Sequence, residues 1–368
     1  MSPARVVLAV NAGSSSIKCS LYRVAGDDAT LLSQEHRDVT EDSRSEVLAA
    51  ILSDLARADL PTPDAAGHRV VHGGVRHQSP VLIDAMVLDG LRALTPLAPL
   101  HQPAALDGIA AVARNYPDLT QVACFDTAFH HDLPEVAQRL PLPDALWELG
   151  VRRYGFHGLS YEHIVATVGP NELGRAVFAH LGSGASLAAV DHGRSIDTTM
   201  AFTPASGIPM STRAGDLDPS VLVYLAREHN YTADALEHLV ERESGLLALS
   251  GSTADMRTLL GARPTDPRAA LAVTAFCYRV RAQMGAYAAV LGGLDTLVFT
   301  GGIGERSAPI RAEICEGLEH LGVSIDQVAN DRNDDIIGQS RSGCTVRVVP
   351  TDEEVVIARH TATLVSDA

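Results

Sequence analysis

The sequence contains almost no lysine. Its 368 residues include 29 basic side chains, of which 28 are arginine and only Lys18 is lysine. Codon or genome bias accounts for most such skews, because Arg replaces Lys wherever a general positive charge is enough. The two residues are not interchangeable where a compact ammonium group must meet a phosphate. Lys18 is therefore the first candidate functional residue.

Other absences exclude whole classes of protein. No apolar run approaches the roughly 18 to 20 residues of a membrane span, and residues 1–5 lead directly into a strand-like run, so we expect no signal peptide. The net charge of −16 is unsuited to nucleic acid or an anionic membrane surface. Hydrophobic residues at 46% and charged residues at 20% are typical of a globular chain and not of a disordered one.

Paired cysteines are absent too. The five cysteines show no CxxC or other regular spacing and lie in apolar segments. This pattern predicts reduced core thiols in a cytoplasmic protein. They are Cys19, Cys124, Cys277, Cys315 and Cys344.

Strand-like and helical segments alternate along the chain, which predicts an α/β protein with mixed sheets. The length suggests two domains. The predicted strands are 5–10, 17–24, 66–71, 121–125, 175–181, 185–190, 294–300 and 345–349. The predicted helices are 45–57, 104–115, 219–228, 233–243, 268–291, 308–321 and 353–364.

A faint internal repeat connects the two halves. The arrangement of strand, turn of small residues and strand at 5–24 returns at 175–190, without a fixed sequence period. The Pro-rich stretch 133–142 is predicted to be a loop and a boundary between domains.

The first turn carries the sequence NAGSSSIK at residues 11–18. Its backbone N–H groups and hydroxyls suit phosphate oxygens, and Lys18 would bring a charge to the same place. An ordinary Ser-rich hairpin turn is the alternative interpretation.

Two further glycine-rich segments follow strands, at 180–186 and 301–305. Neither fits the G-x-G-x-x-G fingerprint or the G-x-x-x-x-G-K-[ST] loop, so neither a Rossmann site nor a P-loop is indicated. Two hairpin turns and one Gly-rich strand end match the phosphate and adenosine loops of the actin, Hsp70 and sugar-kinase fold. Scattered polar residues at the ends of apolar strands point to a cleft, although a structural role remains the alternative for any single His.

At these residues the chain resembles the acetate kinase family of acetate and propionate kinases, from end to end. The matching blocks are NAGSSSIK at 11–18, GHRVVHGG at 67–74, APLH at 98–101, FDTAFH at 125–130, RRYGFHG at 152–158, DTTMAFTP at 197–204, TRAGDLDP at 212–219, FTGGIGE at 299–305 and PTDEEVVIAR at 350–359.

The resemblance implies two duplicated lobes of the ribonuclease H-like fold, with a cleft between them. One lobe would be 1–127 with the C-terminal helix 354–368, and the other 128–353. It implies reversible transfer of the γ-phosphoryl group of ATP to acetate, giving acetyl phosphate and ADP with Mg²⁺ or Mn²⁺. It also implies a homodimer joined through the second lobe.

Residue roles carry over with the blocks. The matching catalytic residues are Arg69, His101, Asp126, His157 and Arg213. Asn11 and Glu353 match residues at the metal, and Asp126 would help to orient it. Val71, Leu100, Phe156 and Pro204 match the pocket for the acetate methyl group. Nucleotide contacts are expected at Asn11, Ser14, Ser16, Lys18, His180, Gly182, Ser183, Gly184, Asp255, Met256, Arg257, Gly301, Gly302, Ile303, Gly304 and Arg306.

The chain departs from the family pattern on the nucleotide side. Ser183 and Arg306 each stand where the family usually has Asn, so Arg306 is expected to alter nucleotide preference, with a solvated Arg of no role as the alternative. Gln102 replaces the Asn after the active-site His, and Leu159 and Tyr161 replace the usual Thr and His.

Three alternatives stay open. The first is a propionate or other short-chain acyl kinase, or one that uses GTP or pyrophosphate. Val71 should crowd acids longer than acetate without excluding propionate. The second is a kinase acting on a hydroxyl group, with Asp126 as its base; the paired Arg69 and Arg213 speak against it. The third is a nucleotide-binding switch without kinase activity.

Overall fold

The computed structural model describes residues 4–13, 16–39, 43–99 and 101–366, which divide into two compact units. Unit 1 comprises Met1–His131, Phe156–His163 and Asp352–Ala368, and unit 2 comprises Asp132–Gly155 and Ile164–Thr351. The sequence assigned all of 128–353 to the second lobe. Phe156–His163 belongs instead to unit 1, because Gly158 donates a 2.8 Å hydrogen bond to the carbonyl of Asp126 and Leu159 is part of the unit 1 core.

Unit 1 is built on a sheet of six strands in the order β3-β2-β1-β4-β6-β5. The first three strands form an antiparallel meander, and β4 and β6 run parallel to β1. The strands are β1 (Arg5–Ala12), β2 (Ser16–Ala25), β3 (Asp28–Asp38), β4 (Ala65–Val70), β5 (Val81–Leu82) and β6 (Thr120–Phe125).

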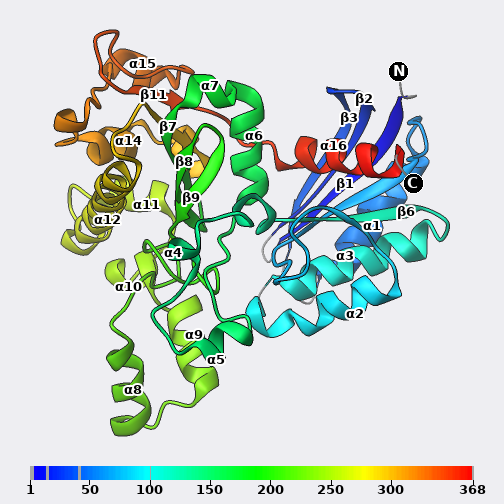
Figure 1. The fold of residues 1–368 in the computed structure, drawn as a ribbon, viewed down its shortest axis with the longest axis horizontal. Helices are drawn as coiled ribbons and strands as arrows, with labels where there is room; N and C mark the ends of the chain where they lie inside the picture. The colour runs from blue at the N-terminus through cyan, green and yellow to red at the C-terminus, as the bar shows by residue number, and fades with distance from the viewer. Residues whose placement is uncertain (1–3, 14–15, 40–42, 100, 367–368) are drawn as a thin grey trace. The chain divides into compact units, whose positions relative to one another are not determined.

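Helices cover both faces of this sheet because apolar residues alternate along β1. Val7 and Ala9 belong to a core with α16 (Glu353–Ser366), whereas Leu8 and Val10 belong to a core with α1 (Arg44–Arg57) and α3 (Gln102–Asn115). Figure 1 shows α16, in red, on one face of the sheet and α1 and α3 on the other. α2 (Ala85–Ala93) packs against α3.

Glycine permits the closest contact between α16 and the sheet. A Cβ atom at Gly67 of β4 would lie 2.1 Å from Thr361 Oγ1 and 2.5 Å from Ile357 Cγ2. The position therefore requires glycine for packing and not for backbone conformation.

Unit 2 repeats the strand arrangement of unit 1. Its sheet has the order β11-β10-β7-β8-β9, with β8 and β9 antiparallel and β10 and β11 parallel to β7. This is the order β6-β4-β1-β2-β3 of unit 1, so the faint repeat in the sequence corresponds to a duplicated topology. The strands are β7 (Arg175–Leu181), β8 (Ala185–Asp191), β9 (Arg194–Thr198), β10 (Thr296–Thr300) and β11 (Thr345–Val348).

The long helix α12 (Pro267–Leu291) packs against β7 and β8 in unit 2. α6 (Gly158–Val168) starts in unit 1 and ends in unit 2. The other helices are α4 (Glu135–Gln138), α5 (Asp144–Glu148), α7 (Pro170–Leu173), α8 (Pro219–Glu228), α9 (Ala233–Arg242), α10 (Gly245–Ser250), α11 (Met256–Ala262), α13 (Gly301–Arg306), α14 (Ala308–Cys315) and α15 (Gln327–Arg332).

The glycine-rich segment after β10 differs from its prediction, because it forms the short helix α13 and not a loop. The helix predicted at 308–321 ends at Cys315, since Gly317 adopts a positive φ of 83°. All five cysteines are free and buried, as predicted. Within the described ranges no helix is long and apolar enough to cross a membrane.

Candidate functional site

Polar residues gather at one edge of the unit 1 sheet. β1, β4 and β6 are parallel, so their carboxyl ends meet at the same edge. Asn11 lies near the end of β1, Arg69 near the end of β4, and Asp126 directly after β6. Glu353 joins them from the first turn of α16. The structure thus brings together four predicted residues that are far apart in the sequence.

Arg69 is the centre of this group. Its Nε is 3.0 Å from both carboxylate oxygens of Asp126, and its Nη2 donates to Asp126 Oδ2 at 2.7 Å. Its Nη1 lies 3.2 Å from Asn11 Oδ1 and 3.3 Å from Glu353 Oε2. The side chain is 20% exposed while Asp126 is 1% exposed. The guanidinium is therefore held by neighbours on one side and keeps an open side for an anion.

The charges of this pair are set by burial and by their neighbours. Burial favours the neutral form of Arg69, but Asp126, Glu353 and Glu354 outweigh it and raise the pKa of the guanidinium. Burial also raises the pKa of Asp126 to about 6, an effect that Arg69 opposes and Glu353 reinforces. Both groups are charged at neutral pH, so the contact is an ion pair.

Lys18 lies at the same edge, where it pairs with Asn11 across the β1–β2 hairpin. Its Nζ lies 2.5 Å from Glu354 Oε2, and Asn11 Nδ2 donates to Glu354 Oε1 at 2.9 Å. The Lys18 side chain is 30% exposed. The hairpin turn is closed by a 2.8 Å hydrogen bond from Gly13 N–H to the carbonyl of Ser16. Ser14, predicted to contact the nucleotide, is outside the described residues.

Glu354 is a residue that sequence reasoning did not select. It is 2% exposed and bonds both Asn11 and Lys18. The available signal was the pair of acids in the first turn of α16, where the helix dipole favours negative charge. Sequence alone could not show that Glu354 faces inward.

The donor set at this edge fits a hard divalent cation. Asp126, Glu353 and Glu354 provide three carboxylates against the two cations Lys18 and Arg69, so negative charge is in excess. Mg²⁺ commonly takes one or two protein carboxylates and completes its shell with water and substrate phosphate. Among the described residues no group of three or more His, Cys, Asp or Glu side chains is placed to hold a metal ion by itself. A cation here would depend on the substrate for part of its coordination.

His157 and Phe156 belong to the same unit. His157 is 9% exposed and has a positive φ of 60°, a conformation rare for residues with a Cβ atom. Phe156 is buried, its carbonyl bonds His130 Nε2 at 3.1 Å, and its ring meets His72 edge-on at 5.5 Å. Backbone strain at an active-site candidate is typical of a side chain held in a fixed direction.

Two predicted residues, Val71 and His101, lie at the segment after β4 and at the start of the helix that holds it. Val71 follows the strand directly and is partly buried, and His101 precedes α3. Leu100 is outside the described residues. The buried Gln102 side chain accepts from His72 N–H and donates to the His72 carbonyl, both at 3.3 Å, which fixes this segment. Gln102 therefore acts on the position of the loop.

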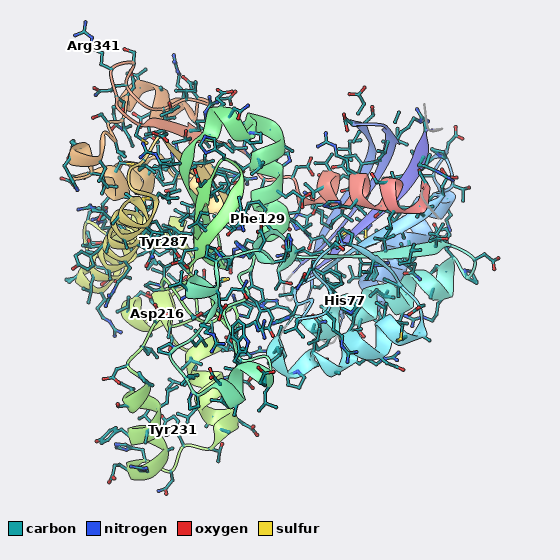
Figure 2. The ribbon with its side chains drawn as sticks, in the orientation of Figure 1. His77, Phe129, Asp216, Tyr231, Tyr287 and Arg341 are labelled. Atoms are coloured by element: carbon teal, nitrogen blue, oxygen red, sulfur yellow. The ribbon has the colours of Figure 1, made fainter. Side chains whose placement is uncertain are left out.

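The end of β6 is supported by aromatic contacts. His77 stacks on Phe125 with ring centroids 5.2 Å apart, directly before Asp126. Phe129 contacts Tyr161, which is fully buried. Both His77 and Phe129 are labelled in Figure 2. Tyr161 and the buried Leu159 are thus core residues, which accounts for their apolar character.

The second predicted arginine, Arg213, lies in unit 2. Its Nε is 3.2 Å from Glu241 Oε2 of α9, and its Nη1 donates to the carbonyl of Pro204 at 3.3 Å. Burial raises the pKa of Glu241, while Arg213 opposes the shift. The loop is pinned by Asp216 (Figure 2), whose carboxylate accepts from Gly207 N–H at 2.7 Å. Arg213 and Pro204 are therefore neighbours, and Glu241 is a partner that the sequence did not reveal.

Unit 2 also contains a cavity of about 670 Å³. It is lined by eight of the residues predicted to bind nucleotide: Gly182, Ser183, Asp255, Met256, Arg257, Gly302, Ile303 and Arg306. The sequence did not select six further lining residues: Ser211, Thr212, Ala254, Leu260, Ser307 and Pro309. The volume is in the range of small-molecule sites.

Four further predicted nucleotide residues of unit 2, His180, Gly184, Gly301 and Gly304, belong to the same two segments but do not line the cavity. His180 is at the end of β7, where it pairs with Ser186 and Thr300. Gly184 closes the hairpin turn by accepting from Gly182 N–H at 3.1 Å. Gly301 has a φ of 76°, and a Cβ atom there would lie 2.9 Å from the Leu181 carbonyl, whereas Gly304 is buried.

A buried arginine supports the helix below the cavity. Arg311 is 0% exposed, and its Nη1 donates to the carbonyls of Gly304 and Glu305 at 2.8 and 2.9 Å. Its Nε and Nη2 bond Asn330, and Nη2 also bonds Asn333. Burial lowers its pKa. The side chain ties the carboxyl end of α13 to α15.

Comparisons with known proteins agree with this geometry. The family model described as "Acetokinase family" matches residues 32–359. An acetate kinase from Rhodopseudomonas palustris (strain TIE-1) is 45% identical, over 96% of this chain and 97% of its own length. The acetate kinase structure from Porphyromonas gingivalis has a TM-score of 0.84 at 35% identity, covering 98% of this chain and all of its own. A propionate kinase from Francisella tularensis has a TM-score of 0.87 at 33% identity, covering 98% and 99%.

Proposed function

The chain belongs to the acetokinase family and is a phosphotransferase with a carboxyl group as acceptor, and from this premise we propose how its residues carry out the transfer. A carboxylate oxygen of acetate attacks the γ-phosphorus of ATP, and the bond from that phosphorus to the ADP oxygen breaks. Acetyl phosphate and ADP are the products, and the reverse reaction uses the same groups.

The observation that carries this proposal is the fixed position of Arg69. Its guanidinium is held by Asp126, Asn11 and Glu353 and remains partly exposed. A planar, permanently charged fork held in this way suits a carboxylate or a phosphoryl group. Arg213 in unit 2, held by Glu241, has the corresponding role for the second anion. Such preorganised charges stabilise a phosphoryl transition state without reorganising.

The geometry disfavours a kinase that acts on a hydroxyl group. Such an enzyme needs a free carboxylate to accept the hydroxyl proton, but Asp126 accepts from Arg69 with both oxygens. Acetate is already ionised and needs no base. Positioning and charge neutralisation therefore carry the rate.

A divalent cation, Mg²⁺ or Mn²⁺, would be held by Glu353, with Asn11 beside it, and Asp126 would help to orient it. When bound, it neutralises charge on the phosphates. Asn11 donates to Glu353 Oε2 at 3.0 Å, which orients this carboxylate. Lys18 would meet phosphate oxygens, since it pairs with Asn11 across the hairpin. His157 and His101 would donate to the phosphoryl group.

The cavity of unit 2 would hold the nucleotide. The Gly182 N–H already bonds the Gly184 carbonyl, so the N–H groups of Ser183 and Gly184 would meet phosphate, and the apolar residues Met256, Leu260 and Ile303 suit a base. Val71 and Phe156 of unit 1 would contact the methyl group of the acid. Val71 is β-branched and should disfavour propionate by about 1 to 3 kcal/mol without excluding it.

The chain would function as a homodimer in which unit 2 provides the interface. Large apolar side chains on its helices are exposed, which is typical of association sites. They include Val221, Val223 and Tyr224 of α8 and Leu271 and Tyr278 of α12. Light scattering on the purified chain tests this, with a monomeric mass as the contrary result.

The test of the function is a hydroxamate assay with Mg²⁺ over a panel of acids, beside a panel of sugars and of phosphoryl donors. We expect turnover with acetate, weaker turnover with propionate, and none with sugars. Turnover of a sugar would favour the hydroxyl-directed kinase. Nucleotide binding without turnover of any acid would favour a nucleotide switch.

A further inference from the structure

Two arginines in the unit 2 cavity lack hydrogen-bond partners. Among the described residues Arg306 forms neither a hydrogen bond nor an ion pair, and Arg257 only lowers the pKa of Asp255 from a distance. That pKa is lowered mainly by the hydrogen bonds of Asp255 to Thr258. The cavity lining thus holds two guanidinium groups against one carboxylate, in a chain with a net charge of −16. Both side chains are exposed to solvent, so their donors are available to a ligand bound in the cavity.

The two ends of the cavity differ in chemistry. At one end the backbone is accessible, because a Cβ atom at the exposed Gly302 would meet no atom within 4 Å. Arg306 lies four residues beyond Gly302 on α13, about 6 Å along the helix. The apolar residues Leu260 and Pro309 also line the cavity. Phosphates suit the glycine end, and the base therefore suits the end that carries Arg306.

The donor pattern of arginine discriminates between purines. A guanidinium has only donors. Adenine presents an acceptor at N7 but an amino donor at position 6, whereas guanine and hypoxanthine present two acceptors, N7 and O6. A fork that binds both acceptors of a 6-oxopurine is therefore mismatched to adenine.

Resting on the proposed function, we propose that Arg306 determines nucleotide specificity by binding the O6 and N7 atoms of a 6-oxopurine. The enzyme then uses GTP and ITP at least as well as ATP. Arg311 contributes indirectly, because its bonds to the carbonyls of Gly304 and Glu305 fix the end of α13 from which Arg306 projects.

The test compares kcat/KM for GTP, ITP and ATP in the unsubstituted enzyme and in Arg306→Asn. We expect the variant to lose roughly tenfold for GTP and ITP alike, with ATP unchanged or improved. 7-Deaza-GTP should be a poor donor for the unsubstituted enzyme and insensitive to the substitution. The matched control is Arg341→Asn, an exposed arginine remote from the cavity lining (Figure 2), which should leave all three values unchanged.

Equal losses for ATP and GTP, or a change in the rate with pyrophosphate, would place Arg306 at the phosphates and overturn the proposal. An unchanged GTP to ATP ratio would also overturn it. If no donor supports turnover, the proposed function fails, and calorimetry of GDP and ADP binding to both proteins still decides the role of Arg306. Loss of GDP affinity alone, in the variant, supports it.

Discussion

The carboxyl edges of the two sheets have the same strand order but opposite chemistry. In unit 1 the strand ends carry Asn11, Arg69 and Asp126, which are linked into one charged network with the start of α16. In unit 2 the ends of β7 and β10 run into the glycine-rich segments 182–184 and 301–304, which border a cavity. Because the topology is shared, the difference lies in the side chains. A charged edge suits transfer of a phosphoryl group, and a glycine-rich edge suits a ligand that approaches the backbone.

The largest expected effect is that of Arg69→Lys at the charged edge. Lysine cannot contact Asp126, Asn11 and an anion at once, so kcat should fall by about 100- to 1,000-fold while the KM for nucleotide changes little. Steady-state kinetics with acetate measures both. Arg175→Lys is the control, since this exposed arginine pairs with Asp295 in unit 2 and should not affect the rate. If Arg69→Lys changed only the KM for nucleotide, the charged edge of unit 1 would bind nucleotide and would not carry out the transfer.

The second prediction concerns the close packing of α16 against Gly67 of β4, in the unit that carries the charged edge. Gly67→Ala forces a methyl group onto Thr361 and Ile357 of α16, and should lower the free energy of unfolding by about 1 to 3 kcal/mol. Gly285→Ala in α12 meets no atom within 4 Å and should be neutral or stabilising by up to about 1 kcal/mol. Urea denaturation compares the two variants. If the two variants had equal free energies of unfolding, α16 would be able to shift away from β4 at no cost.

The third prediction is a roughly tenfold loss of kcat or of donor affinity in Lys18→Arg. The planar fork is bulkier and more weakly hydrated than the ammonium that now meets Glu354. Arg23→Lys, a reverse exchange at an exposed position of the same strand, should have no effect. Full activity in Lys18→Arg would mean that the single lysine survives by chance.

The smallest effect on activity is expected from lowering the pH to about 6, near the pKa of Asp126. Asp126, with its pKa raised by burial to about 6, pairs with Arg69 only when it is deprotonated. Activity should therefore be present above pH 6, fall to half near pH 6 and decline further below it. A pH profile of kcat/KM measures the midpoint. Glu241→Gln removes the carboxylate in unit 2 whose pKa is also raised; it should lower the rate and leave the midpoint in place. If Glu241→Gln shifts the pH midpoint, the loss of activity in acid would be due to Glu241 in unit 2 and not to Asp126.

The sequence predicted the interior strands and one edge strand, β11, but missed the edge strands β3, β5 and β9. β1 and β7 are continuous apolar runs, whereas β3 reads DATLLSQEHRD and β9 reads RSIDT. An edge strand has only one neighbouring strand and is partly exposed, so its sequence need not show a regular apolar pattern. β3 and β9 are strands because they pair with β2 and β8. α13 was missed for a related reason, since glycine-rich segments normally disfavour a helix.

The site could be predicted only as far as family motifs reached. Asn11, Arg69, Asp126 and Glu353 belong to four separate motifs, and no local pattern shows that they meet. Two partners were missed: Glu354, which bonds Asn11 and Lys18, and Glu241, which bonds Arg213. These pairs depend on which face of α16 or α9 turns inward, and the sequence does not show this. Gln102 resembled a departure in the active site, but its hydrogen bonds to the backbone of His72 identify it as a structural residue.

The duplicated strand order has an evolutionary consequence. Each unit presents its own hairpin turn and its own strand ends, so substitutions in one leave the hydrogen-bond network of the other intact. Under the proposed roles, the network around Arg69 in unit 1 and the lining of the unit 2 cavity can therefore change independently. A lineage could exchange its donor through Ser183 and Arg306 while Arg69 and its partners stay fixed. The duplicated strand order thus allows the charged network of one unit and the donor specificity of the other to evolve separately.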